Sequence, residues 1–436
     1  MRYALFQKEI KDFFKSKTTL LFFILLLLLI SYSFYTAVDL YSKASLAAID
    51  DPLYAAGFEP VQGVFVPSFG GFFIIISLLA PFLFIQSIGS EKKHKTLPLL
   101  AQLPCPLYSI FLIKFAAGVI LLLISIIVSA LVVFLWYIPG GHLPLQELFL
   151  LLFGYFLYGL FIISISFFSA ALFNSNAQAS IFALSLIMLS WFVDFGKDMN
   201  IISVFSGLSS WTVTRQLKKF EDGIFSFSST GFFLLLSSYF LSIAYLFFDF
   251  TQRKKLKLTA TITVIFLALF AINTNIHFNF DLTESKRNSF SSEANQFLKK
   301  IPPVKIDIFL EAGDSRAIDY KKDFLKKLTL VKPDVKINYM SDKLLSENYG
   351  SFRYTINKKS EETFSNSEEE IFMILEGLSG LKIKRSTINE SFCGYPLVVN
   401  RHWSIYLFLL YIVILPIIIL FVYLKSNFNK EFSWKE

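Results

Sequence analysis

Residues that could carry out acid–base, nucleophilic or metal chemistry are scattered through this sequence. There is no G-x-x-x-x-G-K-[ST] phosphate-binding loop, no H-E-x-x-H zinc motif and no cluster of Cys and His with metal-ligand spacing. The four histidines suit interfacial positions, because they fall in loops and at the edges of apolar runs; they are His94, His142, His277 and His402. We therefore expect this chain to have no catalytic residues and to bind no metal and no cofactor.

Two acidic features have simple explanations. Glu368, Glu369 and Glu370 lie near the start of an expected helix, where the helix macrodipole favours negative charge without a metal. Asp194 is the one acid inside an apolar run, and an ionisable group within a span is a functional hypothesis by default. Its position near the outer end of the run favours solvation. Neither feature predicts an enzyme.

The elements around these residues are those of a membrane protein. Of the 436 residues, 54% are hydrophobic and only 17% are charged, against about 25% charged in a soluble domain. Eight apolar runs are long enough to cross a bilayer as helices. We place them at 19–38, 69–88, 115–136, 148–168, 177–195, 231–248, 258–272 and 403–424. Most basic residues outside the last long loop flank these runs, so anionic lipid and topology explain the net charge of +8 and no nucleic acid is expected.

The distribution of charge predicts the orientation of the chain. Lys and Arg gather on the side of the N-terminus, which by the positive-inside rule places both termini in the cytoplasm and the polar segment 273–402 outside. The first apolar run lacks a small-residue cleavage site, so we expect it to be retained as a span. Cys105 and Cys393 lie in separate polar regions and are expected to be free thiols.

The segment before the first span predicts an amphipathic helix that lies in the membrane interface and contacts lipids. Its apolar face holds Tyr3, Phe6, Ile10, Phe13 and Phe14. The opposite face holds Lys8, Lys11, Asp12 and Lys15. Such a helix either only anchors the chain or also contacts a partner protein.

A second cytoplasmic segment, between the second and third spans, reads Gly89-Ser-Glu-Lys-Lys-His-Lys-Thr-Leu-Pro-Leu-Leu-Ala-Gln-Leu-Pro-Cys-Pro-Leu-Tyr-Ser-Ile-Phe-Leu-Ile-Lys114. It resembles the signature loop of type 2 ABC exporter permeases, which forms a short coupling helix that docks on the ATPase subunit. The positions that match are Glu91, Thr96, Leu99, Leu100, Pro104 and Lys114. The segment departs from the family at Lys95 and Ile113, where Gly is usual, and an ordinary basic connector is the alternative.

The order of interfacial helix, loop and six spans over residues 1–248 is also that of this family. The resemblance implies a separate cytoplasmic ABC ATPase that uses the ATP, a homodimer or paired permease, and a location in the bacterial cytoplasmic (inner) membrane. It also implies short re-entrant helices in the outer loop 196–230. That loop contains Trp211, Arg215, Lys218 and Lys219, which taken singly are interfacial anchors.

The start of the polar segment is similar to the auxiliary subunit of gliding-motility-type ABC transporters. That subunit opens its outer domain with Asp-x-Thr, a basic residue, a Ser/Thr-rich turn and a strand that follows a Pro. Those positions are held by Asp281, Thr283, Lys286, Ser289, Ser291 and Pro303. The segment is shorter than the family's domain, so the resemblance implies a truncated version.

Periodicity within the polar segment predicts a small α/β domain. Alternating apolar residues indicate strands at 304–310, 335–340 and 352–356, and apolar residues at helical spacing indicate helices at 316–330 and 368–378. The first two strands and the helix between them form a β-α-β unit. Positive and negative charges nearly cancel here, as expected for a solvated surface without a single-sign ligand patch.

These observations predict a polytopic α-helical membrane protein with about eight transmembrane helices and one extracytoplasmic α/β domain. The expected parts are an interfacial helix (1–18), a six-helix permease domain (19–250), a seventh span (251–272), the outer domain (273–402), an eighth span (403–424) and a cytoplasmic tail (425–436). The expected function is that of an ABC exporter permease without its own ATPase motifs. An ABC-type mechanotransmitter, or a non-transporting scaffold for envelope or gliding-motility machinery, is the alternative.

Overall fold

The computed structural model describes residues 2–48, 55, 57–93, 96, 99, 102, 104–198, 211–249, 253–276, 278–311, 314–340, 348–383 and 392–432. The chain forms two compact units, which we call the helical unit (Met1–Phe278 and Cys393–Glu436) and the sheet unit (Asn279–Phe392). Leu100 and residues 199–210 of the expected re-entrant region lie outside the described residues.

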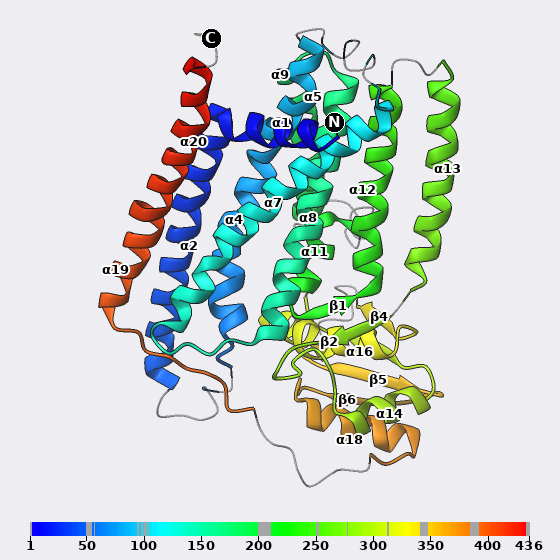
Figure 1. Ribbon diagram of the computed structural model, residues 1–436. Coiled ribbons are helices and arrows are strands. Elements are labelled where there is room, and N and C mark those ends of the chain that lie inside the picture. Colours follow the sequence, from blue (N-terminus) through cyan, green and yellow to red (C-terminus); the bar gives the residue numbers. More distant parts are fainter. Residues whose placement is uncertain are drawn as a thin grey trace. The chain divides into compact units, whose positions relative to one another are not determined.

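The helical unit consists of long helices with one crosswise helix at the N-terminus (Figure 1). Its first elements are α1 (Arg2–Lys15), α2 (Lys17–Ala48), the π-helical turn η1 (Val61–Phe65), α4 (Val66–Leu78), α5 (Ala80–Lys93), α7 (Leu107–Tyr137) and α8 (Leu145–Leu172). They are followed by α9 (Asn176–Asp198), α11 (Val213–Glu221), β1 (Ile224–Ser226), α12 (Phe227–Phe248) and α13 (Lys255–Thr274). The unit ends with η4 (Arg401–Trp403), α19 (Ser404–Leu407), η5 (Phe408–Ile414) and α20 (Leu415–Phe432).

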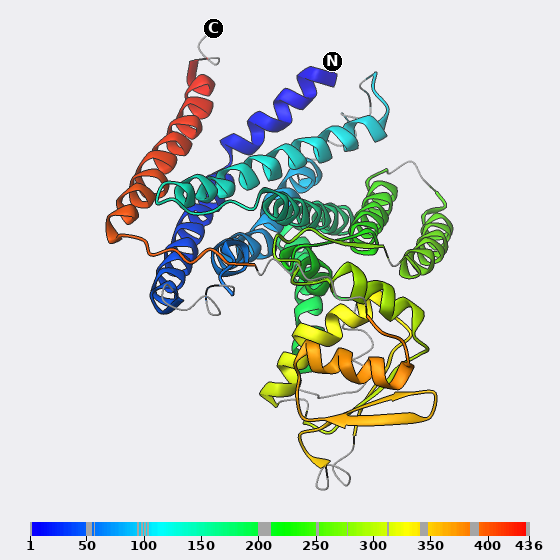
Figure 2. The same cartoon turned by 90° about the horizontal axis from the view of Figure 1, so that it is seen from below.

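Eight helices in the described part of the chain are long and apolar enough to cross a membrane, as the sequence predicts. Each contains the core of one expected span, and several extend beyond it. The first runs from Lys17 to Ala48 and the second from Val61 to Lys93. The first is longer than expected because its helix continues past the apolar core, and the second because its helix begins eight residues before the expected start as well as continuing five residues past the expected end. Figure 2, the view from below, places α20 (red) and α13 (green) at opposite edges of this unit.

Helix α8 is the central helix of the unit and packs against α5, α7, α9, α11 and α12. Small residues allow the close approaches: a Cβ at Gly159 would lie 2.4 Å from Leu122, and one at Gly154 would lie 2.6 Å from Phe220. The buried serines of α8 satisfy their hydroxyls within the helix, as Ser166 does by donating to the carbonyl of Ile162 (2.6 Å). Tyr158 shares a hydrogen bond with Ser77 of α4 (2.6 Å). The core therefore needs no water to satisfy these groups.

The last span lies beside the first. Trp403 meets Phe34 of α2 edge-on, with ring centroids 5.5 Å apart, and stacks on Tyr35. Eight residues later, in η5, the Tyr411 hydroxyl donates to the carbonyl of Val128 in α7 (2.8 Å). Aromatic packing and one buried hydrogen bond thus hold the C-terminal helix against α2 and α7.

The extended segment that leads into this helix is bonded to the far end of α2. The Tyr395 amide donates to the carbonyl of Phe58 (2.8 Å), and the Tyr41 hydroxyl donates to the carbonyl of Tyr395 (2.7 Å). The amides of Leu397 and Val399 donate to hydroxyls of serines in α2. These bonds satisfy backbone groups that no strand partner would satisfy.

The sheet unit contains one four-stranded sheet in the order β4-β3-β5-β6. Its elements are β2 (Asn279–Asp281), α14 (Ser292–Lys300), β3 (Lys305–Ile308), α15 (Ser315–Tyr320), η3 (Lys321–Leu325), α16 (Lys326–Val331), β4 (Lys336–Tyr339), β5 (Phe352–Ile356), β6 (Lys359–Thr363) and α18 (Glu368–Ser379). β3 and β4 are parallel with the helical run 315–331 between them, so the expected β-α-β unit is present. Helix α14 and strand β6 were not expected from the sequence; β6 pairs with β5 in an antiparallel hairpin.

Asp281 organises the turn at the start of the sheet unit. One of its carboxylate oxygens accepts from the Thr283 amide and hydroxyl (3.0 and 2.5 Å). The other accepts from the Asn288 amide and the Ser289 hydroxyl (3.0 and 2.9 Å). Ser291 then caps α14 by accepting from the Ala294 amide (3.2 Å). The residues of the Asp-x-Thr segment and the Ser-rich turn thus act in one local structure.

Candidate functional site: a buried ion-pair cluster below the α5–α7 loop

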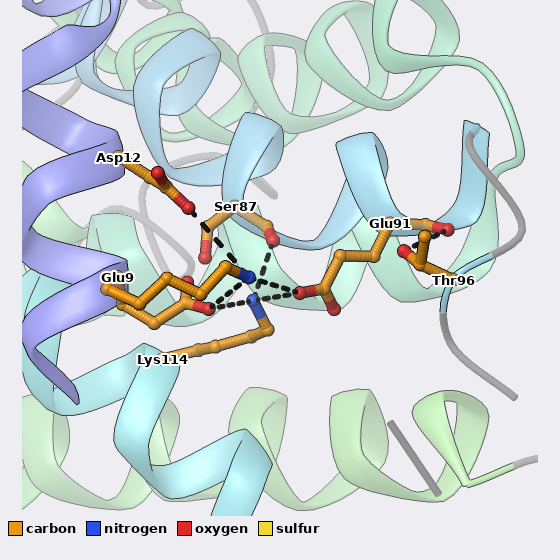
Figure 3. Close-up of polar contacts among 7 residues, drawn as sticks. Glu9, Asp12, Ser87, Glu91, Thr96 and Lys114 are labelled. Carbon is orange, nitrogen blue, oxygen red and sulfur yellow. Dashed lines mark hydrogen bonds and ion pairs between the residues drawn. The ribbon is translucent and has the colours of Figure 1, made fainter. Parts of the chain in front are cut away.

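Three helices meet at a lysine that lies inside the helical unit. The Lys114 ammonium, in the second turn of α7, lies 2.8 Å from a carboxylate oxygen of Glu9 in α1 and 2.8 Å from one of Glu91 in α5 (Figure 3). It also donates to the carbonyl of Ser87 (3.1 Å). An ammonium has three donors, and here three acceptors from two other helices match them. We call Glu9, Lys114 and Glu91 the ion-pair cluster.

The ion-pair cluster is almost completely buried. The side chains of Lys114, Glu9 and Glu91 are 1%, 5% and 8% exposed. Burial of charge is costly, and removing one partner of a buried ion pair typically costs about 3–5 kcal/mol because the other charge is left uncompensated. The cluster therefore ties α1, α5 and α7 together only while all its members are in place.

Lys8 lies at the rim of the cluster and completes its charge balance. Its ammonium is 3.7 Å from Glu9, 3.9 Å from Glu91 and 3.8 Å from Asp12. The Lys8 side chain is 53% exposed, so its interaction with the two buried carboxylates is screened by solvent. Two buried acids therefore share one buried lysine and one lysine at the surface.

The sequence of α1 explains how Glu9 reaches the interior. Phe6, Glu9 and Phe13 are spaced by three and four residues, so they share one face of the helix. Phe13 is buried and meets Phe84 of α5 edge-on, with ring centroids 6.3 Å apart. Glu9 enters the interior one turn before Phe13. Of the residues expected on the apolar face, Phe6, Ile10 and Phe14 are half-buried and Tyr3 is 72% exposed.

The last turn of α5 is also held by the end of α8. The Lys92 ammonium donates to the carbonyls of Ala170 (2.7 Å), Ala171 (2.5 Å) and Phe173 (3.2 Å), which end α8. A lysine in this position caps the free carbonyls of a helix C-terminus. Gly89 packs so closely on Asn176 that a Cβ there would lie 1.8 Å from the amide oxygen. The turn that carries Glu91 therefore has contacts with α1, α7, α8 and α9.

The α5–α7 loop, residues 94–106, begins directly after this turn, and the structure describes six of its positions: 96, 99, 102 and 104–106. Thr96 donates to the carbonyl of Glu91 through its amide (3.0 Å) and its hydroxyl (3.3 Å), which ends α5. Leu99 is 62% exposed and Pro104 is exposed. The matched residues thus form two groups. Glu91 and Lys114 are joined inside the protein, whereas Leu99 and Pro104 face outward.

Sequence reasoning identified Glu91 and Lys114 but missed Glu9, Lys8 and Lys92. A signal for Glu9 was present, because a carboxylate on the same helical face as Phe6 and Phe13 must find a cation if that face is buried. No comparable signal marked Lys92, whose partners are backbone carbonyls.

Asp194 and Glu368, which the sequence singled out, each pair with a basic residue. Asp194 accepts from the hydroxyls of Thr212 (2.7 Å) and Thr214 and pairs with Arg215 (3.3 Å), so it joins α9 to α11. This differs from the expected solvation, because α11 folds back onto α8 and α12. Glu368 pairs with Lys327 (3.0 Å). Within the described ranges, no group of three or more His, Cys, Asp or Glu residues could hold a metal ion.

Comparison with known proteins gives one match. Residues 3–197 match the family model described as ABC-2 family transporter protein, which is less than half of the 436-residue chain but includes the whole ion-pair cluster and the α5–α7 loop. No curated protein and no solved structure matches the chain. The family implies a membrane subunit that associates with an ABC ATPase and is not itself the ATPase. The match, together with the eight apolar helices, supports a multi-pass permease of the ABC-2 type.

Proposed function

We propose that this protein is the permease subunit of an ATP-driven ABC exporter of the bacterial cytoplasmic membrane, and that a separate cytoplasmic ATPase docks on the α5–α7 loop and α1. The observation that carries this proposal is the division of the matched residues into a buried base and an exposed tip. Glu91 and Lys114 fix the base, and Leu99 and Pro104 are free for a partner. A docking loop needs both parts, because force on the tip reaches the spans only through a rigid base.

The shared location of the cluster members supports the proposed topology. Glu9 is near the N-terminus, Glu91 lies in the last turn of the second span and Lys114 lies near the start of the third, yet all three meet. The N-terminal helix and the α5–α7 loop therefore lie at the same end of the helical unit. With basic residues concentrated there, the positive-inside rule assigns this end, and both termini, to the cytoplasm.

The sheet unit fits the role of a truncated auxiliary domain on the outer side of the membrane. Of the six residues behind the resemblance to gliding-motility-type subunits, all but Pro303 take part in the turn around Asp281 or in the cap of α14. A shared set of residues that makes one defined turn is better support for the resemblance than scattered matches. The proposal has three further parts. The protein takes part in export, two permease copies assemble with two ATPases, and the ATPase partner uses the ATP.

The test is a pull-down from the native host with an exposed residue changed. The tagged wild-type protein, in mild detergent, is expected to retain an ABC ATPase, identified by mass spectrometry and by ATP hydrolysis in the eluate. Leu99→Asp should remove it, because a charge at the exposed tip opposes an apolar contact. Leu381→Asp is the matched control, since Leu381 is an exposed leucine of the sheet unit.

Each outcome of the pull-down has a distinct meaning. Retention by the wild type and by Leu381→Asp, but not by Leu99→Asp, supports docking at the loop. Equal retention of the ATPase by all three proteins would show that the ATPase docks on a surface other than the tip of the α5–α7 loop. If the wild type retains no ATPase, the permease proposal is wrong and the scaffold alternative replaces it.

A further inference from the structure

Glu9 makes a contact that the proposed docking loop does not explain. It lies on α1, outside the loop, but its carboxylate is 2.8 Å from the same ammonium that binds Glu91. Lys114 already has Glu91 as a neutralising partner and the Ser87 carbonyl as a third acceptor. A second buried acid is therefore unnecessary for the charge of Lys114. Its presence on α1 requires another explanation.

The geometry of the contact offers a mechanical explanation for the presence of Glu9 on α1. The apolar contact between Phe13 and Phe84 tolerates small displacements of α1, because dispersion forces have little directionality. A charge-assisted hydrogen bond in a buried site is directional and has no water to replace it. Any shift of α1 along or around its axis would pull Glu9 away from Lys114. The position of α1 is thereby tied to the turn of α5 from which the loop begins.

We propose that Glu9 is a positioning residue that fixes α1 to the base of the α5–α7 loop, so that the two segments move together when the ATPase changes conformation. This inference rests on the proposed function, because it assigns to Glu9 a part in transmitting the motion of the docked ATPase. It adds α1 to the moving element. The amphipathic helix is then more than a membrane anchor.

Glu9→Leu is the informative variant. It leaves Lys114 paired with Glu91, so no buried charge loses its last partner, and leucine is an apolar residue that suits a buried position on the helix face that carries Phe13. Glu9→Gln is the milder second variant, since it removes the charge but keeps an oxygen that can accept from Lys114. Asp12→Asn is the matched control, because Asp12 is an acid on the same helix whose side chain is 56% exposed.

The measurement is hydrogen–deuterium exchange by mass spectrometry on the purified complex of full-length permease and ATPase, with and without a non-hydrolysable ATP analogue. In the wild type and in Asp12→Asn, we expect the nucleotide to change amide exchange both in the loop and in α1. In Glu9→Leu, the change in the loop should remain and the change in α1 should be lost. Glu9→Gln should lose part of the nucleotide-dependent change in α1. If Glu9→Leu does not fold, this partial loss in Glu9→Gln tests the role of Glu9 in its place.

The outcomes separate this inference from the proposed function. A nucleotide response of α1 that is the same in Glu9→Leu and in the wild type would overturn the role of Glu9 while leaving ATPase docking intact. Loss of the ATPase from Glu9→Leu, with α7 and α8 protected as in the wild type, would also overturn it, because Glu9 would then be needed for docking of the ATPase and not for transmission of its motion to α1. Absence of the ATPase from the wild-type complex would instead refute the proposed function.

Discussion

The two units of this protein each bury a lysine, and they do so in different ways. In the sheet unit, the Lys332 ammonium donates to the carbonyls of Ile301 (2.8 Å) and Leu298 (3.4 Å) at the end of α14. Its nearest acid, Asp334, is 3.8 Å away and half exposed. In the helical unit, Lys114 instead joins two buried acids from two separate helices. Lys332 completes a local helix end, whereas Lys114 connects elements that are distant in the sequence.

The difference between Lys332 and Lys114 separates buried charges that only stabilise the fold from those that connect separate helices. A lysine bound to carbonyls satisfies groups that every helix end leaves free, so it indicates stability only. A lysine bound to carboxylates from different helices makes the position of each helix depend on the others. By this criterion the half-buried Lys92, which caps α8, belongs with Lys332. Of the two buried lysines among the described residues, only Lys114 connects separate helices.

The largest effect is expected from Lys114→Met. The substitution leaves Glu9 and Glu91 buried beside each other without a buried cation, and we expect it to lower the free energy of unfolding by about 3–5 kcal/mol. Hydrogen exchange of α1 and α7 amides should accelerate strongly. Lys8→Met is the control, since Lys8 is half exposed and should have little effect. Unchanged protection of α1 would contradict the assigned role of the cluster.

A smaller effect is expected from Lys332→Met. The methionine keeps most of the apolar stem but leaves the carbonyls of Leu298 and Ile301 without this donor, which costs about 1–3 kcal/mol. Exchange should accelerate in α14 and remain at the wild-type rate in α1 and α7. If Lys332→Met instead destabilises its unit as much as Lys114→Met does, the distinction between a capping and a connecting lysine fails.

The smallest effect is expected at the surface of the sheet unit. The Tyr349 hydroxyl donates to Asp314 (2.7 Å), and this bond, together with the Arg316 amide, lowers the pKa of the Asp314 carboxyl below its ordinary value of 3.8. The stabilisation is complete above the ordinary pKa and is lost as pH falls through the lower folded-state pKa. Tyr349→Phe should raise the pKa of Asp314.

The measurement is the acid-induced loss of amide protection in α15, compared between wild type and Tyr349→Phe at matched pH. Loss should begin at a higher pH in the variant, since its Asp314 protonates sooner. The two proteins should become equal at the lowest pH, where Asp314 is protonated in both. An onset at the same pH in both would show that Tyr349 does not perturb this carboxyl.

Elements that depend on local sequence patterns could be predicted, whereas elements that depend on pairing with another segment of the chain could not. The eight spans depend on runs of apolar residues and were found, although α2 extends to Ala48 because its helix continues past the apolar run. The β-α-β unit depends on local periodicity and was also found. β6 was missed because Lys359–Thr363 is largely polar, and its strand conformation comes from pairing with β5.

The candidate site could be predicted only in part, for a related reason. Glu91 and Lys114 were found through a resemblance, not through any property of the two residues themselves. Their mutual contact, and the contribution of Glu9 from 105 positions away, depend on how α1 packs across α7. Leu99 and Pro104 match by type, and their exposure is known only from the fold.

The packing of the C-terminal span against α2 has a consequence for the synthesis and membrane insertion of the chain. Phe34 of the first span is synthesised 369 residues before Trp403, the last residue of η4, which covers it. At about 5–20 residues per second, the nascent chain keeps that surface of α2 in contact with lipid for roughly 20–75 s. Phe34 and Tyr35 must therefore be compatible with a bilayer first and with a tryptophan later, and large aromatic rings suit both. The packing of the helical unit around α2 is therefore completed only after the segment with Trp403 has been synthesised.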